Sequence, residues 1–147
     1  MKAVIQRVKS ASVEVDGRIV GDIGRGLMVL LGIGKDDTIR DIQWMVDKII
    51  NLRIFENENG KLDESLLDIK GELLLVSQFT LYGDCSKGRR PSFTDAMGAE
   101  EAKRLFEIFV AKAKEKIEKV ETGIFQTTMN VSIINEGPVT LIVDSKQ

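Results

Sequence analysis

The first quarter of the chain carries apolar runs that are typical of β-strands. In residues 11–15 an apolar side chain stands at every second position, and Asp16-Gly17 then supplies a turn that is common in β-hairpins. The four predicted strands cover residues 3–8, 11–15, 18–23 and 26–34. The chain therefore begins with a β-rich segment before any helix.

Two later segments have an apolar spacing of three to four residues, which predicts α-helices. The first is expected over residues 38–51, where Thr38 and Asp41 match a capping box. The second is expected over residues 99–118, with acidic residues in its first turn and lysines near its end, as the helix dipole favours. We expect the apolar stripe of each helix to pack on a sheet.

The remaining apolar runs predict further strands separated by polar loops. Residues 72–82 form one of these runs, and its first half is apolar on both faces. The other predicted strands cover residues 51–55, 123–135 and 138–144, and the predicted loops cover residues 56–69, with an Asn59-Gly60 turn, and residues 83–92. We expect an α+β fold, a single domain over residues 1–147, with a mainly antiparallel sheet or barrel-like core and two outer α-helices.

Composition and charge narrow the class of protein. Apolar residues make up 43% of the 147 residues and charged residues 30%, and no apolar run is long enough to span a bilayer. The N-terminal segment lacks the apolar stretch of a signal peptide, so we expect a soluble, cytoplasmic protein with no membrane partner. The net charge is −2, so a nucleic acid could be held only by a local basic patch.

The chain contains no histidine, which removes several kinds of chemistry at once. Ser-His-Asp and Cys-His nucleophile systems need the imidazole, and so does nearly every zinc site. The one cysteine, Cys85, has no partner for an internal disulfide or a metal cluster. We expect no metal site and no cofactor, and any reaction must rely on hydroxyls, carboxylates, lysines, backbone groups or groups of the substrate.

A first candidate site lies at Ser77–Thr80, where polar residues appear abruptly at the end of an apolar strand. On a regular strand Ser77 and Phe79 point to one face, whereas Gln78 and Thr80 point to the other. The two hydroxyls can therefore share a site only if the strand bends there. The ordinary alternative is a strand that emerges into solvent.

A second candidate is the short basic cluster formed by Lys87, Arg89 and Arg90, which contains Gly88 and is followed by Pro91. Guanidinium groups on a constrained loop bind phosphates well, and so short a cluster suits one end of a nucleic acid. The alternative is a solvated turn.

A third candidate is the Gly137-Pro138 pair, which interrupts a strand-like pattern in a chain with only two prolines. Proline cannot donate to a ladder, and a cis X-Pro bond allows a sharp reversal of the chain. The alternative is an ordinary tight turn.

Together these motifs resemble the D-aminoacyl-tRNA deacylase family over nearly the whole chain. The resemblance is carried by "AVIQRV" near the N-terminus, "SQFTLYGD", "KGRRPSF", the TGxF…M.V pattern around Met129 and the final N.GPVT pattern. Two positions differ from the family's usual pattern. Glu136 stands where an aspartate is usual, and Gln126 in "FQTTM" follows the phenylalanine directly, where a glycine is expected.

The resemblance implies a hydrolase that cleaves the ester between a D-amino acid and the 3′-terminal ribose of tRNA, and that also clears mischarged glycine. It implies a homodimer in which a cis Gly137-Pro138 peptide of one subunit enters the site of the other and tests chirality. The site residues implied are Ser77, Gln78, Phe79 and Thr80, supported by Arg7 and Met129, with Lys87, Arg89 and Arg90 on phosphates of the acceptor 3′ end.

The resemblance leaves the chemical step open between two mechanisms. The Phe79 N–H is expected to bind the oxyanion and Gln78 to position the substrate. Thr80 is either a nucleophile or, as we prefer, a binding group beside a water assisted by the ribose 2′-hydroxyl, because no base for a threonine nucleophile is obvious. Two other functions are weighed against this reading: a non-catalytic tRNA- or RNA-binding module, and a structural homo-oligomer.

Overall fold

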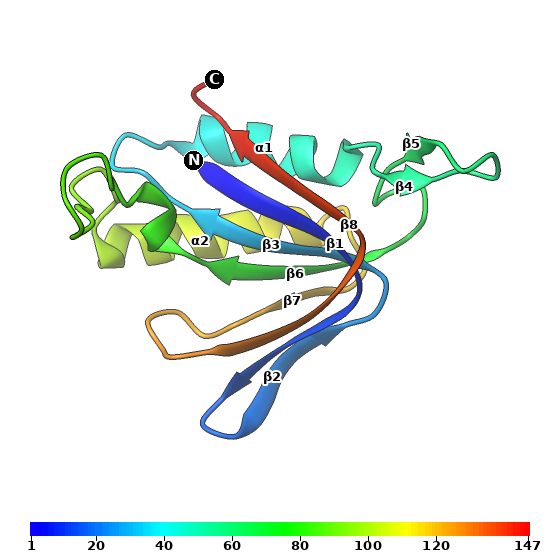
Figure 1. The fold of residues 1–147 in the computed structure, drawn as a ribbon, viewed down its shortest axis with the longest axis horizontal. Coiled ribbons are helices and arrows are strands. Elements are labelled where there is room, and N and C mark those ends of the chain that lie inside the picture. The colour runs from blue at the N-terminus through cyan, green and yellow to red at the C-terminus, as the bar shows by residue number, and fades with distance from the viewer.

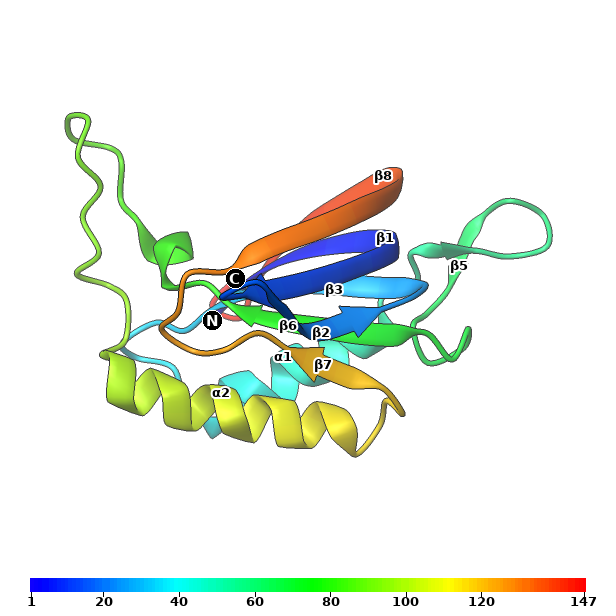
Figure 2. The ribbon, with the colours of Figure 1, turned by 90° about the horizontal axis from the view of Figure 1, so that it is seen from below.

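The computed structural model describes residues 1–147, and it shows a curved mixed sheet with both α-helices on one face (Figure 1). Figure 2 shows the two helices side by side beneath the sheet. In chain order the elements are β1 (Lys2–Val15), β2 (Arg18–Ile23), β3 (Gly26–Gly32), α1 (Ile39–Asn51), β4 (Phe55–Glu56), β5 (Leu62–Glu64), β6 (Glu72–Ser77), the 3₁₀ helix η1 (Phe79–Tyr82), α2 (Ala99–Lys114), β7 (Val120–Thr122) and β8 (Asn130–Asp144).

Strand β1 organises the sheet because it is paired along both edges. Its first half pairs antiparallel with β3 and its second half with β2, while β8 pairs antiparallel with nearly its whole length. Beyond β3, strands β6 and β7 add in parallel. Strand β2 in turn contacts β6 and β7, so the sheet curls into a nearly closed barrel-like core. The predicted fold class is confirmed.

The two predicted strands 3–8 and 11–15 are parts of one strand with a bulge between them. Val8 faces Asn135 and Ser10 faces Ile134, so β1 has one residue more than β8 at Lys9. After the bulge, the positions whose side chains point to a given face of the sheet are therefore shifted by one residue. Ala3 and Ile5 therefore join the core against the helices, whereas Val8, Ala11, Val13 and Val15 line a second core inside the curl of the sheet.

The capping box predicted for the first helix is confirmed and extends to the C-terminal segment. The Asp41 carboxylate accepts the Thr38 N–H, at 2.8 Å, and also the Ser145 hydroxyl, at 2.7 Å. Burial by itself raises the pKa of Asp41, but hydrogen bonds from Lys146 and Ser145 outweigh it and hold that pKa well below its usual range. The last residues of the chain are thereby fastened to the start of α1.

Several predicted boundaries are wrong. The run 72–82 is a strand only to Ser77 and then turns into η1, and 123–135 is a strand only from Asn130. Of the predicted strand 51–55, only Phe55 lies in a strand. That strand is β4, which forms a small hairpin with β5 around the predicted Asn59-Gly60 turn. The second helix ends at Lys114 instead of residue 118. Neither helix has both the length and the apolar character that crossing a membrane requires.

Candidate functional site

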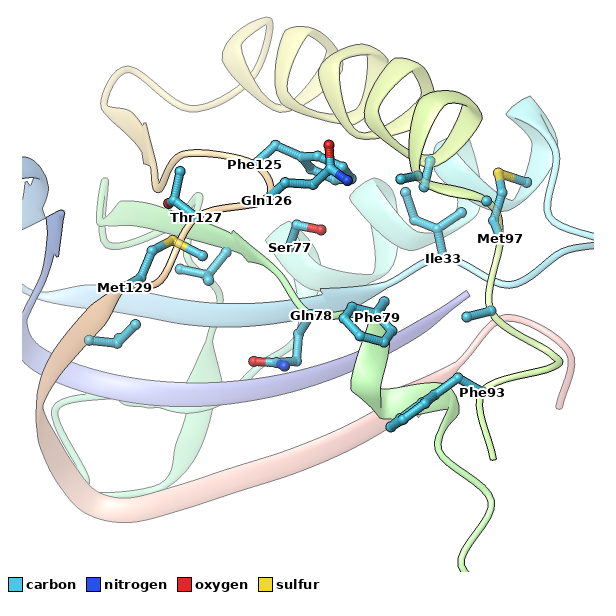
Figure 3. A pocket seen from close by; sticks show the side chains of 16 residues that line it. Ile33, Ser77, Gln78, Phe79, Phe93, Met97, Phe125, Gln126, Thr127 and Met129 are labelled. Carbon is cyan, nitrogen blue, oxygen red and sulfur yellow. The ribbon is translucent and has the colours of Figure 1, made fainter. Parts of the chain in front are cut away.

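A pocket of about 700 Å³ opens where β6 ends, between the start of α2 and the segment that leads into β8 (Figure 3). It is lined by 16 residues, of which 11 are hydrophobic. The polar side chains in the lining are those of Ser77, Gln78, Gln126 and Thr127, and none of the 16 residues is charged. No group of three or more side chains in the chain is arranged to hold a metal ion.

The predicted Ser77–Thr80 stretch lies at this pocket because the strand turns there. Ser77 is the last residue of the β6 ladder, and the Gln78 N–H still donates to the Leu31 carbonyl at 2.8 Å. The chain then enters η1, in which the Gly83 N–H donates to the Thr80 carbonyl at 2.9 Å. The bend is therefore present, but it does not bring the Thr80 hydroxyl into the pocket lining beside Ser77.

The turn changes which side chains meet. Ser77, Gln78 and Phe79 all line the pocket, although a regular strand would send Gln78 to the opposite face. The Gln78 amide Nε2 donates to the Thr80 hydroxyl. Thr80 itself is exposed beside the mouth and is not part of the lining.

The start of η1 also supplies backbone donors. The first N–H groups of a helical turn have no carbonyl within that turn to bind, so they are available to a ligand. Phe79 is the first residue of η1 and lines the pocket. Its N–H is therefore a candidate donor to a developing oxyanion, the role that the family resemblance implies.

The segment before β8 forms another wall, and most of it escaped sequence analysis. Met129 lines the pocket as predicted, together with Phe125, Gln126 and Thr127, which the sequence had assigned to a strand. Gln126 has φ 59°, in the left-handed region that favours glycine. This is the position where the family resemblance led us to expect a glycine, so that difference was the available signal of a turn.

The Gly137-Pro138 pair forms a protruding segment in the middle of β8, here called the Gly-Pro lobe (residues 136–139). Gln6 pairs with Thr140 and Val8 with Asn135, so a single residue of β1, Arg7, stands opposite the whole lobe. The Gly137–Pro138 peptide bond is cis.

Arg7 supports the lobe from below. It is only 5% exposed, and its Nε donates to the Glu136 carbonyl and its Nη1 to the Ile54 carbonyl, each at 3.0 Å. Gly137 has φ 124°, and a Cβ there would lie 2.9 Å from Arg7 Nη2. The position therefore needs glycine for both conformation and space. In the single chain, Arg7 contacts the lobe of its own subunit.

One chain does not bring the lobe and the pocket together. The pocket lining does not include Gly137, Pro138 or Arg7. Figure 1 shows the bend of β8 near one end of the sheet and the turn after β6 near the other.

The basic cluster lies on an extended loop, here called the basic arm (residues 83–96). Figure 2 shows the arm projecting well beyond the sheet and helices. Asp84 pairs with Ser92 at its base, and Lys87, Arg89 and Arg90 are exposed near its tip. These three side chains do not line the pocket, but Phe93 at the base of the arm does.

Comparisons with known proteins agree on one family. The family model described as D-Tyr-tRNA(Tyr) deacylase matches residues 4–144. The chain is 62% identical to a D-aminoacyl-tRNA deacylase of Clostridium tetani and 61% identical to one of Thermosipho africanus, in each case over 147 residues that cover 100% of this chain and 99% of the relative.

Two solved structures are also similar. A c-Myc DNA unwinding element binding protein has a TM-score of 0.94 at 44% identity, with 98% of each chain covered. A probable eukaryotic D-amino acid tRNA deacylase has a TM-score of 0.85 at 18% identity, with 97% of each chain covered, and at that identity the likeness supports the fold alone.

Proposed function

The chain belongs to the D-Tyr-tRNA(Tyr) deacylase family, and from this premise we propose how its own residues recognise and hydrolyse D-aminoacyl-tRNA. The activity is that of a hydrolase acting on the ester bond of D-aminoacyl-tRNA. The observation that carries the proposal is the turn at Ser77–Thr80, which places backbone and amide donors at the mouth of an uncharged pocket. We further propose that glycine wrongly attached to tRNA is removed by the same site, and that the protein acts in the cytoplasm.

In the proposed reaction a water oxygen attacks the ester carbonyl. The Phe79 N–H stabilises the oxyanion, and Gln78 holds the substrate in position. The bond to the ribose 3′-oxygen then breaks, and that oxygen takes up the proton lost by the water, with the neighbouring 2′-hydroxyl as the relay. The products are the free D-amino acid and a tRNA with a free 3′-hydroxyl.

Thr80 serves as a binding group in this mechanism. A threonine nucleophile requires a base within hydrogen-bond reach, and the pocket lining contains no carboxylate, amine or imidazole. The Thr80 hydroxyl instead accepts a hydrogen bond from Gln78. It therefore fixes the amide that orients the substrate.

We propose that the active form is a homodimer in which the Gly-Pro lobe of one subunit completes the pocket of the other. Strand β8 pairs only with β1, and it leaves Ile134 59% and Ile142 80% exposed. A long open strand edge can pair with another chain, and exposed apolar patches mark interaction sites. A second copy would cover this surface and bring a lobe to a pocket that its own chain does not reach.

The lobe would select by shape. The backbone around Gly137 and Pro138 leaves room for a hydrogen, but not for a side chain, on the L side of the substrate's α-carbon. An L-amino acid is thereby excluded, whereas glycine has hydrogens on both sides and is admitted.

The basic arm is proposed to hold the acceptor 3′ end of tRNA. Its three exposed cations, Lys87, Arg89 and Arg90, form the local patch that a protein of net charge −2 needs for this partner.

The proposed function is tested by turnover of tRNA charged with the D- or the L-form of the same amino acid. We expect hydrolysis of the D-ester well above its spontaneous rate and no acceleration for the L-ester. A non-catalytic RNA-binding module would bind both and accelerate neither. Tight binding without any turnover of the D-ester would therefore move the chain to that alternative function.

The source of the proton relay is tested by single-turnover hydrolysis of a D-aminoacyl-tRNA whose terminal ribose lacks the 2′-hydroxyl. We expect a loss of about 10²–10⁴-fold, the usual value of acid–base assistance, and a smaller loss for Thr80→Ala on intact tRNA. A near-normal rate on the deoxy substrate, with the Thr80 variant inactive and an acylated Thr80 trapped in the unmodified protein, would make Thr80 the nucleophile.

Completion of the site by the second subunit is tested by mixing two impaired variants, Gln78→Ala in the pocket and Gly137→Ala in the lobe. A dimer with one chain of each kind contains one intact site, so random exchange should restore about a quarter of the unmodified activity. Proven exchange without any recovery would show that each chain uses its own lobe, or none.

Phosphate contacts by the basic arm are tested by replacing Lys87, Arg89 and Arg90 with glutamine. Affinity falls as salt rises, and each lost phosphate contact should make the slope of log affinity against log salt shallower by about 0.7–0.9, because fewer counterions are released on binding. Binding to uncharged tRNA, measured over a salt series, gives that slope directly. An unchanged slope would mean that the arm does not contact phosphates.

A further inference from the structure

The aromatic ring of Phe79 has no role in the mechanism above. The reaction uses its backbone N–H, while the side chain is 55% exposed. Its neighbour is Phe93, which is 38% exposed, and the two ring centroids lie 5.2 Å apart in an edge-to-face arrangement with an interplanar angle of 67°. Two aromatic rings are thus held together at the surface, and both line the pocket (Figure 3).

These rings lie at the rim of the pocket. The inner lining is well buried, with Val76 1% exposed and Ile33 4% exposed. Phe79 and Phe93 are far more exposed than these residues, so the two rings stand where the pocket opens to solvent.

Phe93 also connects the pocket to the basic arm. It follows Ser92, which pairs with Asp84 to close the base of the arm. A Cβ at Gly83 would lie 3.0 Å from a ring carbon of Phe93, so the ring packs directly against the backbone on the opposite side of the arm. The ring is therefore held in place where the basic arm leaves the pocket.

We propose that the Phe79–Phe93 pair is a stacking site for the nucleobase that precedes the aminoacylated nucleotide. The inference rests on the proposed function, because it requires the 3′ end of tRNA at this pocket. If the aminoacylated nucleoside lies inside, the next nucleotide must pass the rim, and its phosphates must continue toward the exposed cations of the arm. Single-stranded RNA ends are commonly bound by this combination of aromatic rings and basic groups.

An edge-to-face pair suits such a role. Each ring supports the other, and both rings stay partly exposed, so a base can stack against them. Every base has an aromatic face, so the contact adds affinity without selecting a sequence.

The test compares two substrates that share the same ester: D-aminoacyl-tRNA and D-aminoacyl-adenosine, which has no preceding nucleotide. For Phe93→Ala we expect kcat/KM to fall about 5- to 160-fold on the tRNA, the range for loss of one stacked base, and to fall far less on the adenosine ester. Phe93→Trp should keep the activity on tRNA. Phe93→Leu, which keeps an apolar side chain but has no aromatic face, should lose it.

A tRNA that is abasic at the preceding nucleotide completes a double-mutant cycle. For the unmodified protein, removing this base should lower kcat/KM by the same factor as the Phe93→Ala substitution does on intact tRNA. For Phe93→Ala, removing the base should lower kcat/KM no further. Independent, additive losses would overturn the proposal.

Two other outcomes would also overturn it. Equal losses on both substrates would mean that Phe93 shapes the inner pocket, and conversion of the Phe93→Ala protein to monomers in sedimentation would place the rings between subunits.

The unmodified protein is the control for the proposed function itself. If it hydrolyses neither D-ester, that function fails, whereas full activity of Phe93→Ala on every substrate removes only the stacking site.

Discussion

The pairing of strand β1 along both of its edges is the constraint on which the rest of the structure depends. One edge holds β3 and then β2, and the other holds β8, so this single strand connects the barrel-like core to the outer strand that carries the Gly-Pro lobe. The bulge at Lys9 allows the same strand to contribute to both cores. Arg7, just before the bulge, is buried beneath the lobe because β1 runs directly below it.

In the proposed mechanism the site achieves selectivity and catalysis mainly with groups that do not titrate. The pocket is uncharged, its candidate oxyanion donor is a backbone N–H, and the lobe presents backbone where an enzyme of another kind would present a side chain. An aminoacyl ester is already activated, so correct placement of water and carbonyl can supply much of the acceleration. A chain without histidine can therefore perform this reaction, provided that its loops and turns are held rigidly.

Sequence reasoning succeeded where one local pattern determines the structure. Thr38 and Asp41 marked the start of α1, and the first three residues of the polar stretch Ser77–Thr80 lie at a pocket, although Thr80 is outside its lining. It failed where the same alternation of apolar and polar residues suits two structures. Phe79–Tyr82 alternates like a strand but forms a 3₁₀ turn, because the chain leaves the strand direction at Gln78, which has φ −143° and ψ 82°. It also missed Phe93, whose place at the pocket arises from packing between distant segments that no local pattern records. Arg7 was expected only as a supporting residue of the site, and the structure instead places it beneath the lobe of its own chain, a contact that depends on the pairing of two segments distant in sequence.

The position of the lobe within β8 has a consequence for how this segment can change in evolution. Regular pairing with β1 resumes on both sides, at Asn135 before the lobe and at Thr140 after it. A substitution in either flank alters one contact, but an insertion or deletion of one residue would shift the lobe by about 3.3 Å and send the following side chains to the opposite face of the sheet. The flanks of the lobe should therefore vary in residue type while the number of residues in each flank stays constant.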